Sequence, residues 1–296
     1  MELLVFGAGS LGSLLGGLLA REHDVTLVGR DPHMTTVAEQ GLRITGIVDE
    51  HVHPTAVTEV TGQTADVALV TTKSYDTGRA AAALADAEIA SVCSVQNGLG
   101  NEELLADTLA CPVLGGSATY GADLEAPGRV RMTGEGVVTV GTFRGGDATV
   151  SELVDAFRSA SVTAEATEDV ETMLWTKVAI NAAINPVTAL ARCRNGAVTE
   201  SPLSAVAEAA AAEAVAVASA NGIDLDPEAI HERVFDVASA TAENRSSMLQ
   251  DVLCGRRTEI DAINGAVVTR ADDQPVPINR TLRSLVNGLE ANNIDS

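Results

Sequence analysis

Short apolar runs alternate with segments of helical pattern over the first half of the chain. The helical segments run to about Arg21 and from about residues 76, 101 and 151. Strands separated by helices of this length predict parallel βαβ units. The runs with the length and composition of buried strands are residues 3–6, 24–28, 67–71, 90–95 and 113–117. We therefore expect an α/β domain with a doubly wound, mostly parallel sheet.

The pattern changes at two later points in the chain. Residues 128–142 are rich in Gly, Val and Thr and predict a hairpin or meander added to an edge of the main sheet. From about Val170 one helical pattern follows another, and the Ala-rich run 203–220 is a strong helix former that ends at Asn221-Gly222. Asp226 is expected to cap the next helix. We predict an α/β domain over residues 1–167 and an all-α domain over residues 168–296.

Composition narrows the classes of protein that fit this pattern. Apolar residues make up 46% of the 296 residues and aromatic residues 2%, so the core must be aliphatic and wholesale disorder is excluded. The 41 acidic residues against 19 basic ones give a net charge of −22, which excludes a nucleic-acid binder that neutralises phosphates. The same charge argues against docking on anionic lipid. We expect no nucleic-acid partner and no membrane partner.

The basic residues are almost all arginine. Only Lys73 and Lys177 are lysine, against 17 arginines. A Lys-poor, strongly acidic protein suggests a halophilic one in a salt-rich cytoplasm, where ions screen self-repulsion; an acidic protein of an ordinary cell is the alternative. If selection has removed the surface lysines, the two that remain are expected to do work that arginine cannot do.

Neither the cysteines nor the chain start suggests a metal site or a membrane anchor. The four cysteines have no CxxC or other metal-ligand spacing, so we interpret them as small buried hydrophobic residues and expect no metal. No apolar stretch approaches the ~20 residues of a membrane span, and no basic region precedes the first apolar run. A cytoplasmic, reduced protein is expected.

A glycine motif follows the first predicted strand and opens a helix. Gly7-x-Gly9-x-x-Gly12 has the spacing and the context of a dinucleotide-binding fingerprint. Gly7 allows the tight turn, Gly9 lets the backbone approach a pyrophosphate, and Gly12 permits close packing of helix on strand. A glycine-rich turn without a ligand is the plain alternative. We therefore expect the first domain to bind a dinucleotide.

The end of the second predicted strand bears on the choice of cofactor. An NAD enzyme usually has an acidic residue there, which binds the ribose 2′-hydroxyl. This chain has Gly29-Arg30, and a guanidinium pairs with a 2′-phosphate, so NADPH is favoured. Asp31 is evidence to the contrary, but it precedes Pro32 and is expected to cap the next helix.

Polar residues also follow two further predicted strands. Lys73 comes after one and Asn97 after the next, and the carboxyl ends of parallel strands line the ligand crevice of such sheets. Both are therefore placed to touch nicotinamide, ribose or substrate. The alternatives are a solvated loop lysine and an ordinary Asn-Gly turn.

The most informative segment lies in the second domain. Lys177, Asn181 and Asn185 are spaced four residues apart, so they share one face of a helix that is otherwise apolar. Polar groups in such a stripe are costly unless they are paired or bound to a ligand. A solvent-facing stripe is the alternative, although the exposed stripes of this chain are otherwise acidic. Farther on, Ser247 could bond a substrate and Glu259 a lysine or ribose; alone, each is better explained as helix surface.

At these residues the sequence resembles the ketopantoate reductases (2-dehydropantoate 2-reductases). The resemblance covers nearly the whole chain, and its specific motifs are Gln96 to Gly100, the Lys177/Asn181/Asn185-Pro186 helix, Cys193-x-Asn195-Gly196, Asn244 to Asp251, and Thr258 to Gly265. It implies an N-terminal Rossmann domain and a helical C-terminal domain. It also implies NADPH-dependent reduction of 2-dehydropantoate, a small 2-keto acid, to pantoate on the path to pantothenate and coenzyme A. A homodimer is expected for this class of enzyme.

The resemblance also implies roles for individual residues. Lys177 matches the general acid of the family. Lys73 matches a lysine near the nicotinamide, and Arg30 the basic residue on the cofactor side. Substrate contacts are implied for Asn97, Asn181, Asn185, Asn195 and Ser247. Cofactor contacts are implied for Gly7, Ala8, Gly9, Ser10, Leu11, Gly12, Asn97, Ala122 and Glu259.

Two rival functions stay open on the sequence. A related two-domain dehydrogenase could act on another 2-keto or hydroxy acid, although the second-domain motifs argue against it. A non-catalytic NADPH-binding regulator would bind the cofactor without turnover, but a pure sensor needs no proton donor at position 177.

Overall fold

The protein is described by a computed structural model that covers residues 1–146 and 148–293. The chain forms two compact units. Unit 1 contains Met1–Gln96 and Asn101–Val170, and unit 2 contains Asn97–Gly100 and Glu171–Ser296. The four-residue segment Asn97–Gly100 therefore packs with unit 2, although the sequence pattern assigns it to the first domain.

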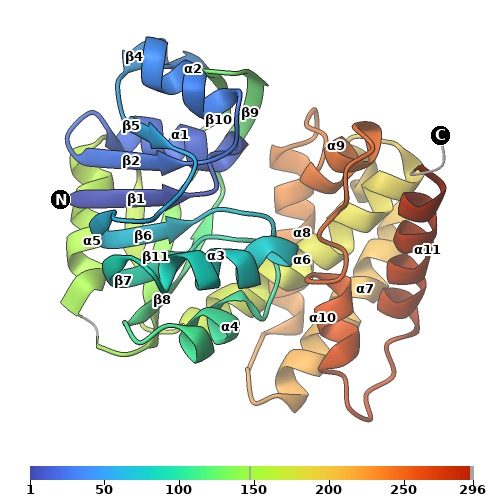
Figure 1. The fold of residues 1–296 in the computed structure, drawn as a ribbon. Helices are drawn as coiled ribbons and strands as arrows, with labels where there is room; N and C mark the ends of the chain where they lie inside the picture. The colour runs from blue at the N-terminus through green and yellow to red at the C-terminus, as the bar shows by residue number, and fades with distance from the viewer. Residues whose placement is uncertain (147, 294–296) are drawn as a thin grey trace. The chain divides into compact units, whose positions relative to one another are not determined.

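Unit 1 is built on a mostly parallel sheet, as predicted (Figure 1). Its eight strands have the order β12-β11-β8-β7-β6-β1-β2-β5. Strand β11 is antiparallel to β8 and parallel to β12, so β11 and β12 run against the direction of the other strands. The strands are β1 (Glu2–Phe6), β2 (Asp24–Val28), β5 (Thr55–Val57), β6 (Thr64–Val70), β7 (Glu88–Ser94), β8 (Val113–Ala118), β11 (Val138–Arg144) and β12 (Ala164–Ala166). The helices are α1 (Ser10–Leu19), α2 (His33–Gln40), the 3-10 turn η1 (Ser74–Asp76), α3 (Thr77–Leu84), α4 (Asn101–Thr108) and α5 (Ala148–Ser159).

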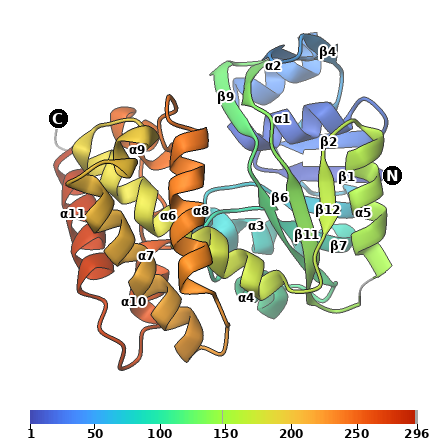
Figure 2. The ribbon, with the colours of Figure 1, turned by 180° about the vertical axis from the view of Figure 1, so that it is seen from behind.

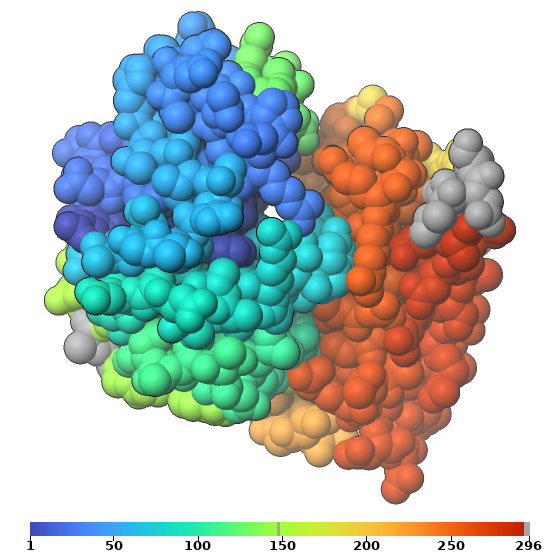
Figure 3. Space-filling view, viewed as in Figure 1, coloured from blue at the N-terminus to red at the C-terminus, as the bar shows by residue number. Residues whose placement is uncertain are grey.

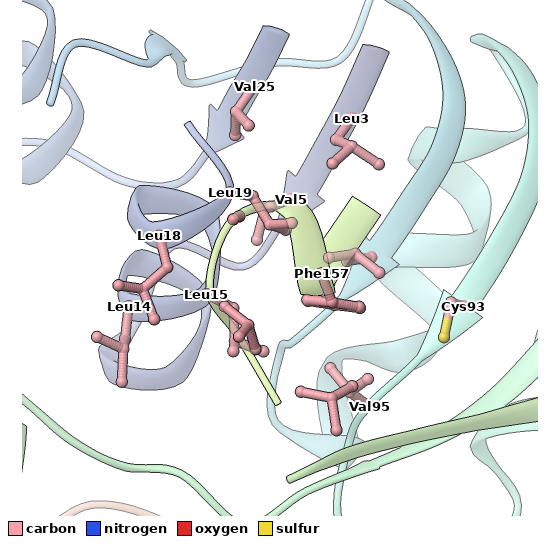
Figure 4. Close-up of a cluster of buried hydrophobic side chains, with 14 of the residues drawn as sticks. Leu3, Val5, Leu14, Leu15, Leu18, Leu19, Val25, Cys93, Val95 and Phe157 are labelled. Carbon is pink, nitrogen blue, oxygen red and sulfur yellow. The ribbon is translucent and has the colours of Figure 1, made fainter. Parts of the chain in front are cut away.

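Helices cover both faces of this sheet. Because successive residues of a strand point to opposite faces, one strand contributes side chains to both apolar layers. Leu3 and Val5 of β1 belong to one apolar cluster with α1 and α5, which Figure 4 shows around Leu15 and Phe157. Leu4, between them, belongs to a second cluster with α3 and α4. The view from behind shows the side of the sheet that carries α5 (Figure 2). The sheet is thus doubly wound, and its core is aliphatic.

A second, four-stranded sheet corrects the prediction for residues 128–142. Its order is β4-β3-β10-β9, with β3 (Leu42–Gly46), β4 (Glu50–Val52), β9 (Gly121–Ala126) and β10 (Arg129–Gly134). Figure 3 shows the green atoms of the β9–β10 segment beside blue atoms of the region around α2. Of this segment only β11 joins the main sheet, where it lies between β8 and β12. β10 leaves it because only alternate residues, Val130 and Met132, are buried, which suits a sheet with one covered face.

A buried histidine ties α2 to this second sheet. The Gly128 backbone N–H donates to His33 Nδ1 over 2.9 Å, so Nε2 carries the ring proton and donates to Ser13 Oγ of α1, also over 2.9 Å. Burial lowers the pKa of His33. A second proton on the ring would remove the acceptor that Gly128 needs.

We expect the free energy of unfolding to depend on pH through His33. The pKa is lower in the folded state, so the stabilisation is complete above the unfolded value of about 6.5 and is lost as the pH falls toward the folded value. Urea titrations at about pH 7.5 and about pH 5.5 measure the free energy of unfolding of the wild type and of His33→Gln. The wild type should exceed the variant by less at the lower pH. The exposed His231→Gln variant is the control. Parallel pH dependences of wild type and His33→Gln would contradict the expectation.

Unit 2 is helical, as predicted. Its long helix α6 (Val170–Ala191) is buried on two sides: Val178 and Ala183 lie in a cluster with α7 and α8, and Ala182 and Ala189 in a cluster with α9 and α11. Asp226 caps α8 through Glu228 N, as predicted. The other elements are η2 (Asn195–Thr199), α7 (Leu203–Ala220), α8 (Pro227–Ala240), α9 (Ser247–Leu253), α10 (Asn264–Thr269) and α11 (Pro277–Asn293).

Helix α7 is the one helix of the described residues that is long and apolar enough, by length and composition, to cross a membrane. The expectation that no stretch approaches this length was therefore too strong. A core helix passes the same test, and the buried face of α7, with Ala207, Ala210 and Ala214, belongs to the apolar cluster of unit 2. Glu213 on the same helix accepts from Ile278 N over 2.8 Å and so caps α11. We interpret α7 as a core helix.

Candidate functional site

The glycine loop of unit 1 is held against the ends of β2 and β6, the two strands that flank β1. Gly7 N and Ala8 N both donate to Val28 O of β2, at 2.9 Å. Gly7 has φ +112°, and a Cβ there would lie 2.7 Å from Thr72 N, beyond β6. A Cβ on Gly12 would overlap Gly7 O. These two positions therefore require glycine.

The start of α1 fits the diphosphate of a dinucleotide. A Cβ on Gly9 would meet only Gly7 O, at 3.9 Å, so backbone and ligand can approach closely here. The first N–H groups of a helix have no intrahelical partner and lie at the positive end of the helix dipole. Within the part of the chain that the structure describes, the first turn of α1 has no acidic residue. Ser10 and Leu11 lie in this turn, and Ser10 Oγ accepts from Leu124 N over 3.1 Å.

Ala122 lies near this helix through β9. It pairs with Met132 of β10, and it packs against the same apolar cluster as Leu11. The structure thus places the strand of the predicted contact Ala122 beside α1, because Leu124 N of the same strand donates to Ser10 Oγ.

Arg30 and Asp31 follow β2 and differ in their partners. Arg30 is 74% exposed, and its Nη2 donates to Asp76 Oδ2 of η1 over 3.4 Å. Asp31 Oδ1 accepts from Thr35 N over 3.1 Å and from Thr35 Oγ1 over 2.6 Å. Asp31 is therefore engaged with the first turn of α2, as the sequence predicts.

A buried amide supports the turn that carries Lys73. Gln96 Nε2 donates to Thr72 O over 3.0 Å and to Thr77 Oγ1 over 2.8 Å. The side chain thus holds the residues before and after Lys73 to the end of β7. Sequence reasoning gave a role to Asn97 and none to Gln96; its position beside Asn97 at a strand end was the available signal.

Asn97 and Glu259 meet in unit 2. Asn97 Nδ2 donates to Glu259 Oε2 over 3.1 Å. The turn is fixed by Leu99 N, which donates to Ala262 O over 3.0 Å, and by Gly98, whose φ is +88°. A Cβ on Gly98 would lie 2.5 Å from Ala262 O, so only glycine fits there. Two predicted contacts that are 162 residues apart in sequence are therefore neighbours.

The predicted polar stripe lies on α6. Lys177 and Asn181 are half-buried, and Asn185 is buried. One turn after Asn185, Thr188 is fully buried, and its Oγ1 lies 2.7 Å from Ser246 Oγ. Ser246 also caps α9 by accepting from Leu249 N over 3.1 Å. The start of α9 is thus joined to the end of the stripe.

Sequence reasoning predicts a substrate contact for Ser247 and gives no role to its neighbour Ser246. Ser247 is exposed at the first residue of α9, whereas the buried bonds belong to Ser246. Asn195 lies close by: its N donates to Asn244 O over 3.0 Å, and its Nδ2 donates to Thr241 Oγ1 over 2.9 Å. Asn195 Oδ1 is buried without a hydrogen-bond partner among the described residues. This carbonyl is available to a donor.

The cysteines differ in burial. Cys93 is fully buried, and burial, together with the nearby charge of Glu102, raises the pKa of its thiol. Burial also raises the pKa of Cys111 and of Cys193, which are partly buried. Cys254 is exposed, so the prediction of four buried cysteines is wrong for this residue. Among the described residues no group of three His, Cys, Asp or Glu could hold a metal.

Comparison with known proteins covers both units. Residues 3–145 match the family model "Ketopantoate reductase PanE/ApbA" and residues 169–290 match "Ketopantoate reductase PanE/ApbA C terminal". A 2-dehydropantoate 2-reductase of Halobacterium salinarum is 43% identical over 304 residues, which cover 97% of this chain and 98% of the relative.

Solved structures share the fold over almost the full length. A PanE/ApbA family ketopantoate reductase from Ralstonia eutropha JMP134 has a TM-score of 0.91 at 32% identity and covers 99% of this chain and 100% of that one. A D-mandelate dehydrogenase with NADH and anilino(oxo)acetate has a TM-score of 0.92, with 99% of each chain covered. Its identity of 22% supports the fold alone.

A mostly parallel sheet with a glycine fingerprint, followed by a helical unit, is the architecture of a class of dinucleotide-binding oxidoreductases. Both units match models of the same family. The chain belongs to the ketopantoate reductase family. It is therefore an enzyme, and its family acts on a small keto acid.

Proposed function

We propose that this enzyme reduces 2-dehydropantoate to (R)-pantoate with NADPH, a step toward pantothenate and coenzyme A. The observation that carries the proposal is the stripe of Lys177, Asn181 and Asn185 on α6, in a chain with only two lysines. Names of relatives, such as the 2-dehydropantoate 2-reductase of Halobacterium salinarum, support the substrate.

Unit 1 would hold the cofactor. The first turn of α1 and the backbone at Gly9 would bind the diphosphate, and Arg30 would pair with the 2′-phosphate. Lys73 would lie toward the nicotinamide end, on the turn held by Gln96. When bound, the reduced nicotinamide supplies a hydride to the carbonyl carbon of the substrate.

Lys177 would supply the proton. Reduction of a ketone places negative charge on the carbonyl oxygen, and an ammonium group in hydrogen-bond reach stabilises that charge. The N–H bond of the ammonium breaks as the new O–H bond forms, which leaves a neutral amine that solvent reprotonates. Arginine cannot replace lysine in this step because its guanidinium does not deprotonate in proteins.

Neutral side chains would hold the substrate. Asn181 and Asn185 continue the stripe, and Asn195 offers a buried carbonyl. Amides and the Ser247 hydroxyl can bond the carboxylate and hydroxyl of the substrate without adding negative charge beside the ammonium. Asn97 and Glu259 are hydrogen-bonded to each other. Asn97 would contact both the substrate and the cofactor, and Glu259 would contact the cofactor.

Initial rates with 2-dehydropantoate and with a panel of other 2-keto acids, each with NADPH and NADH, test this function. We expect the highest kcat/KM with 2-dehydropantoate and NADPH. A higher kcat/KM with another 2-keto acid would identify a related dehydrogenase instead. NADPH binding without turnover of any substrate would identify a regulator.

Arg30→Ala is expected to raise KM for NADPH about 10- to 100-fold, because a charge-assisted hydrogen bond to the 2′-phosphate is lost. KM for NADH should change little. Steady-state kinetics with both cofactors measure the difference. Arg43→Ala is the matched control, because Arg43 is also an exposed arginine paired with an aspartate, Asp49, 2.9 Å away. An equal rise for both cofactors would contradict the role of Arg30.

The surroundings of the enzyme follow from its charge. We propose a salt-rich cytoplasm, supported by the net charge of −22 and by the likeness to a Halobacterium salinarum relative. Activity and the free energy of unfolding are then expected to rise with potassium chloride concentration. The homodimer expected for this class stays a prediction, and sedimentation equilibrium tests it.

A further inference from the structure

We propose that Asp76 sets the strength of the preference for NADPH over NADH by competing with the 2′-phosphate for Arg30. The inference rests on the proposed function, in which Arg30 receives that phosphate. It adds Asp76, the last residue of η1, to the residues that distinguish the two cofactors.

The geometry of Asp76 points to this role. Asp76 is the residue before α3, where an aspartate commonly caps the helix, yet its side chain makes no cap hydrogen bond among the described residues. Its Oδ2 lies 3.4 Å from Arg30 Nη2 instead, with 32% of the side chain exposed. The carboxylate therefore faces the guanidinium across the ends of β2 and β6.

Asp31 is nearer in sequence but is occupied elsewhere. Its Oδ1 accepts two hydrogen bonds from Thr35. Each bond holds the carboxylate at the first turn of α2, so Asp31 is not the partner that the structure gives to Arg30. Of the two carboxylates, Asp76 is the one that meets the selecting cation.

The competition has opposite consequences for the two cofactors. A 2′-phosphate that binds Arg30 comes within a few ångströms of the Asp76 carboxylate, and the like charges repel. A ribose 2′-hydroxyl can instead donate a hydrogen bond to a carboxylate, as it does to the acidic residue of NAD enzymes. Asp76 therefore weakens the binding of NADPH and favours NADH, while Arg30 strengthens the binding of NADPH.

Calorimetric titration of the full chain with 2′,5′-ADP and with ADP tests the inference without turnover. Asp76→Asn is expected to tighten 2′,5′-ADP about threefold to fivefold, a range that suits a charge at a partly exposed site, and to leave ADP unchanged or weaker. High potassium chloride should shrink the gain by screening. Asp49→Asn, which removes an exposed carboxylate from the Arg43 pair, should change neither titration.

The outcomes separate this inference from the proposed function. Unchanged or weaker binding of 2′,5′-ADP by a folded Asp76→Asn protein overturns the role of Asp76, and equal tightening of both ligands does the same. If Arg30→Ala leaves 2′,5′-ADP binding unchanged, the proposed NADPH site fails as well. Weaker binding in Arg30→Ala combined with tighter binding in Asp76→Asn supports both. Thermal unfolding of each variant shows that it is folded.

Discussion

Lys177→Ala is expected to lower kcat for 2-dehydropantoate by a factor of ~10²–10⁴, the range for loss of a general acid. The variant lacks the only group on the α6 stripe that can donate a proton as charge develops on the substrate oxygen; Asn181 and Asn185 are neutral amides of negligible acidity. Stopped-flow single turnovers, followed by nicotinamide absorbance, measure the chemical step separately from product release.

Lys177→Arg is the matched control for charge. It keeps a cation at this position but cannot release the proton, so most of the rate should stay lost while substrate binding is retained. The pH dependence of kcat should also lose the limb that belongs to the acid in both variants. Wild-type turnover in Lys177→Ala, with an unchanged pH profile, would remove Lys177 from the mechanism.

Asn264→Ala is expected to lower the free energy of unfolding by about 2–4 kcal/mol, the cost of two buried acceptors left without a donor. Pro186 lies inside α6 and has no N–H, so the carbonyl of Ala182, four residues earlier, lacks its helical partner. Asn264 Nδ2 donates to that carbonyl over 3.1 Å and also to Asn279 Oδ1 over 2.9 Å. Asn264 and Asn279 are both fully buried.

A double-mutant cycle separates this explanation from simple loss of packing. In Pro186→Ala the backbone N–H at position 186 can bond the Ala182 carbonyl, so Asn264→Ala should cost about 1 kcal/mol less in that background. Urea titrations of the four proteins measure the coupling. An equal cost in both backgrounds would show that Asn264 does not serve the carbonyl freed by Pro186.

The sequence predicted those parts of the fold that depend on local pattern. The parallel strands of the main sheet are buried on both faces and stand out as apolar runs. Strands β3, β4, β5, β9 and β12 were not predicted because each lacks a continuous apolar run. The segment 128–142 was assigned to one sheet, because nothing local shows that β10 pairs with β3, some 86 residues earlier.

For the candidate site, the sequence likewise indicates only what local spacing contains. The glycine loop and the Lys177 stripe have spacings that indicate one turn and one helix face. Side-chain pairs around these features join residues that are far apart in sequence. Examples are the ion pair of Arg30 with Asp76 and the hydrogen bond of Thr188 with Ser246. Such pairs are set by tertiary packing, which the linear pattern does not contain. The substrate contact at Ser247 was implied by the resemblance and stays a prediction, whereas burial of its neighbour Ser246 is set by tertiary packing.

The segment Asn97–Gly100 has a consequence for anyone who recombines this enzyme with a relative. It leaves the end of β7 and packs with the helical unit, so the polypeptide passes between the units three times, at 96/97, 100/101 and 170/171. In a chimera joined at a single point near residue 170, Gly98 and Leu99 would come from one parent and the loop at position 262 from the other. The contacts that Gly98 and Leu99 make with Ala262 would then be mismatched. A transplant of the helical unit must therefore include this tetrapeptide, as a two-piece exchange.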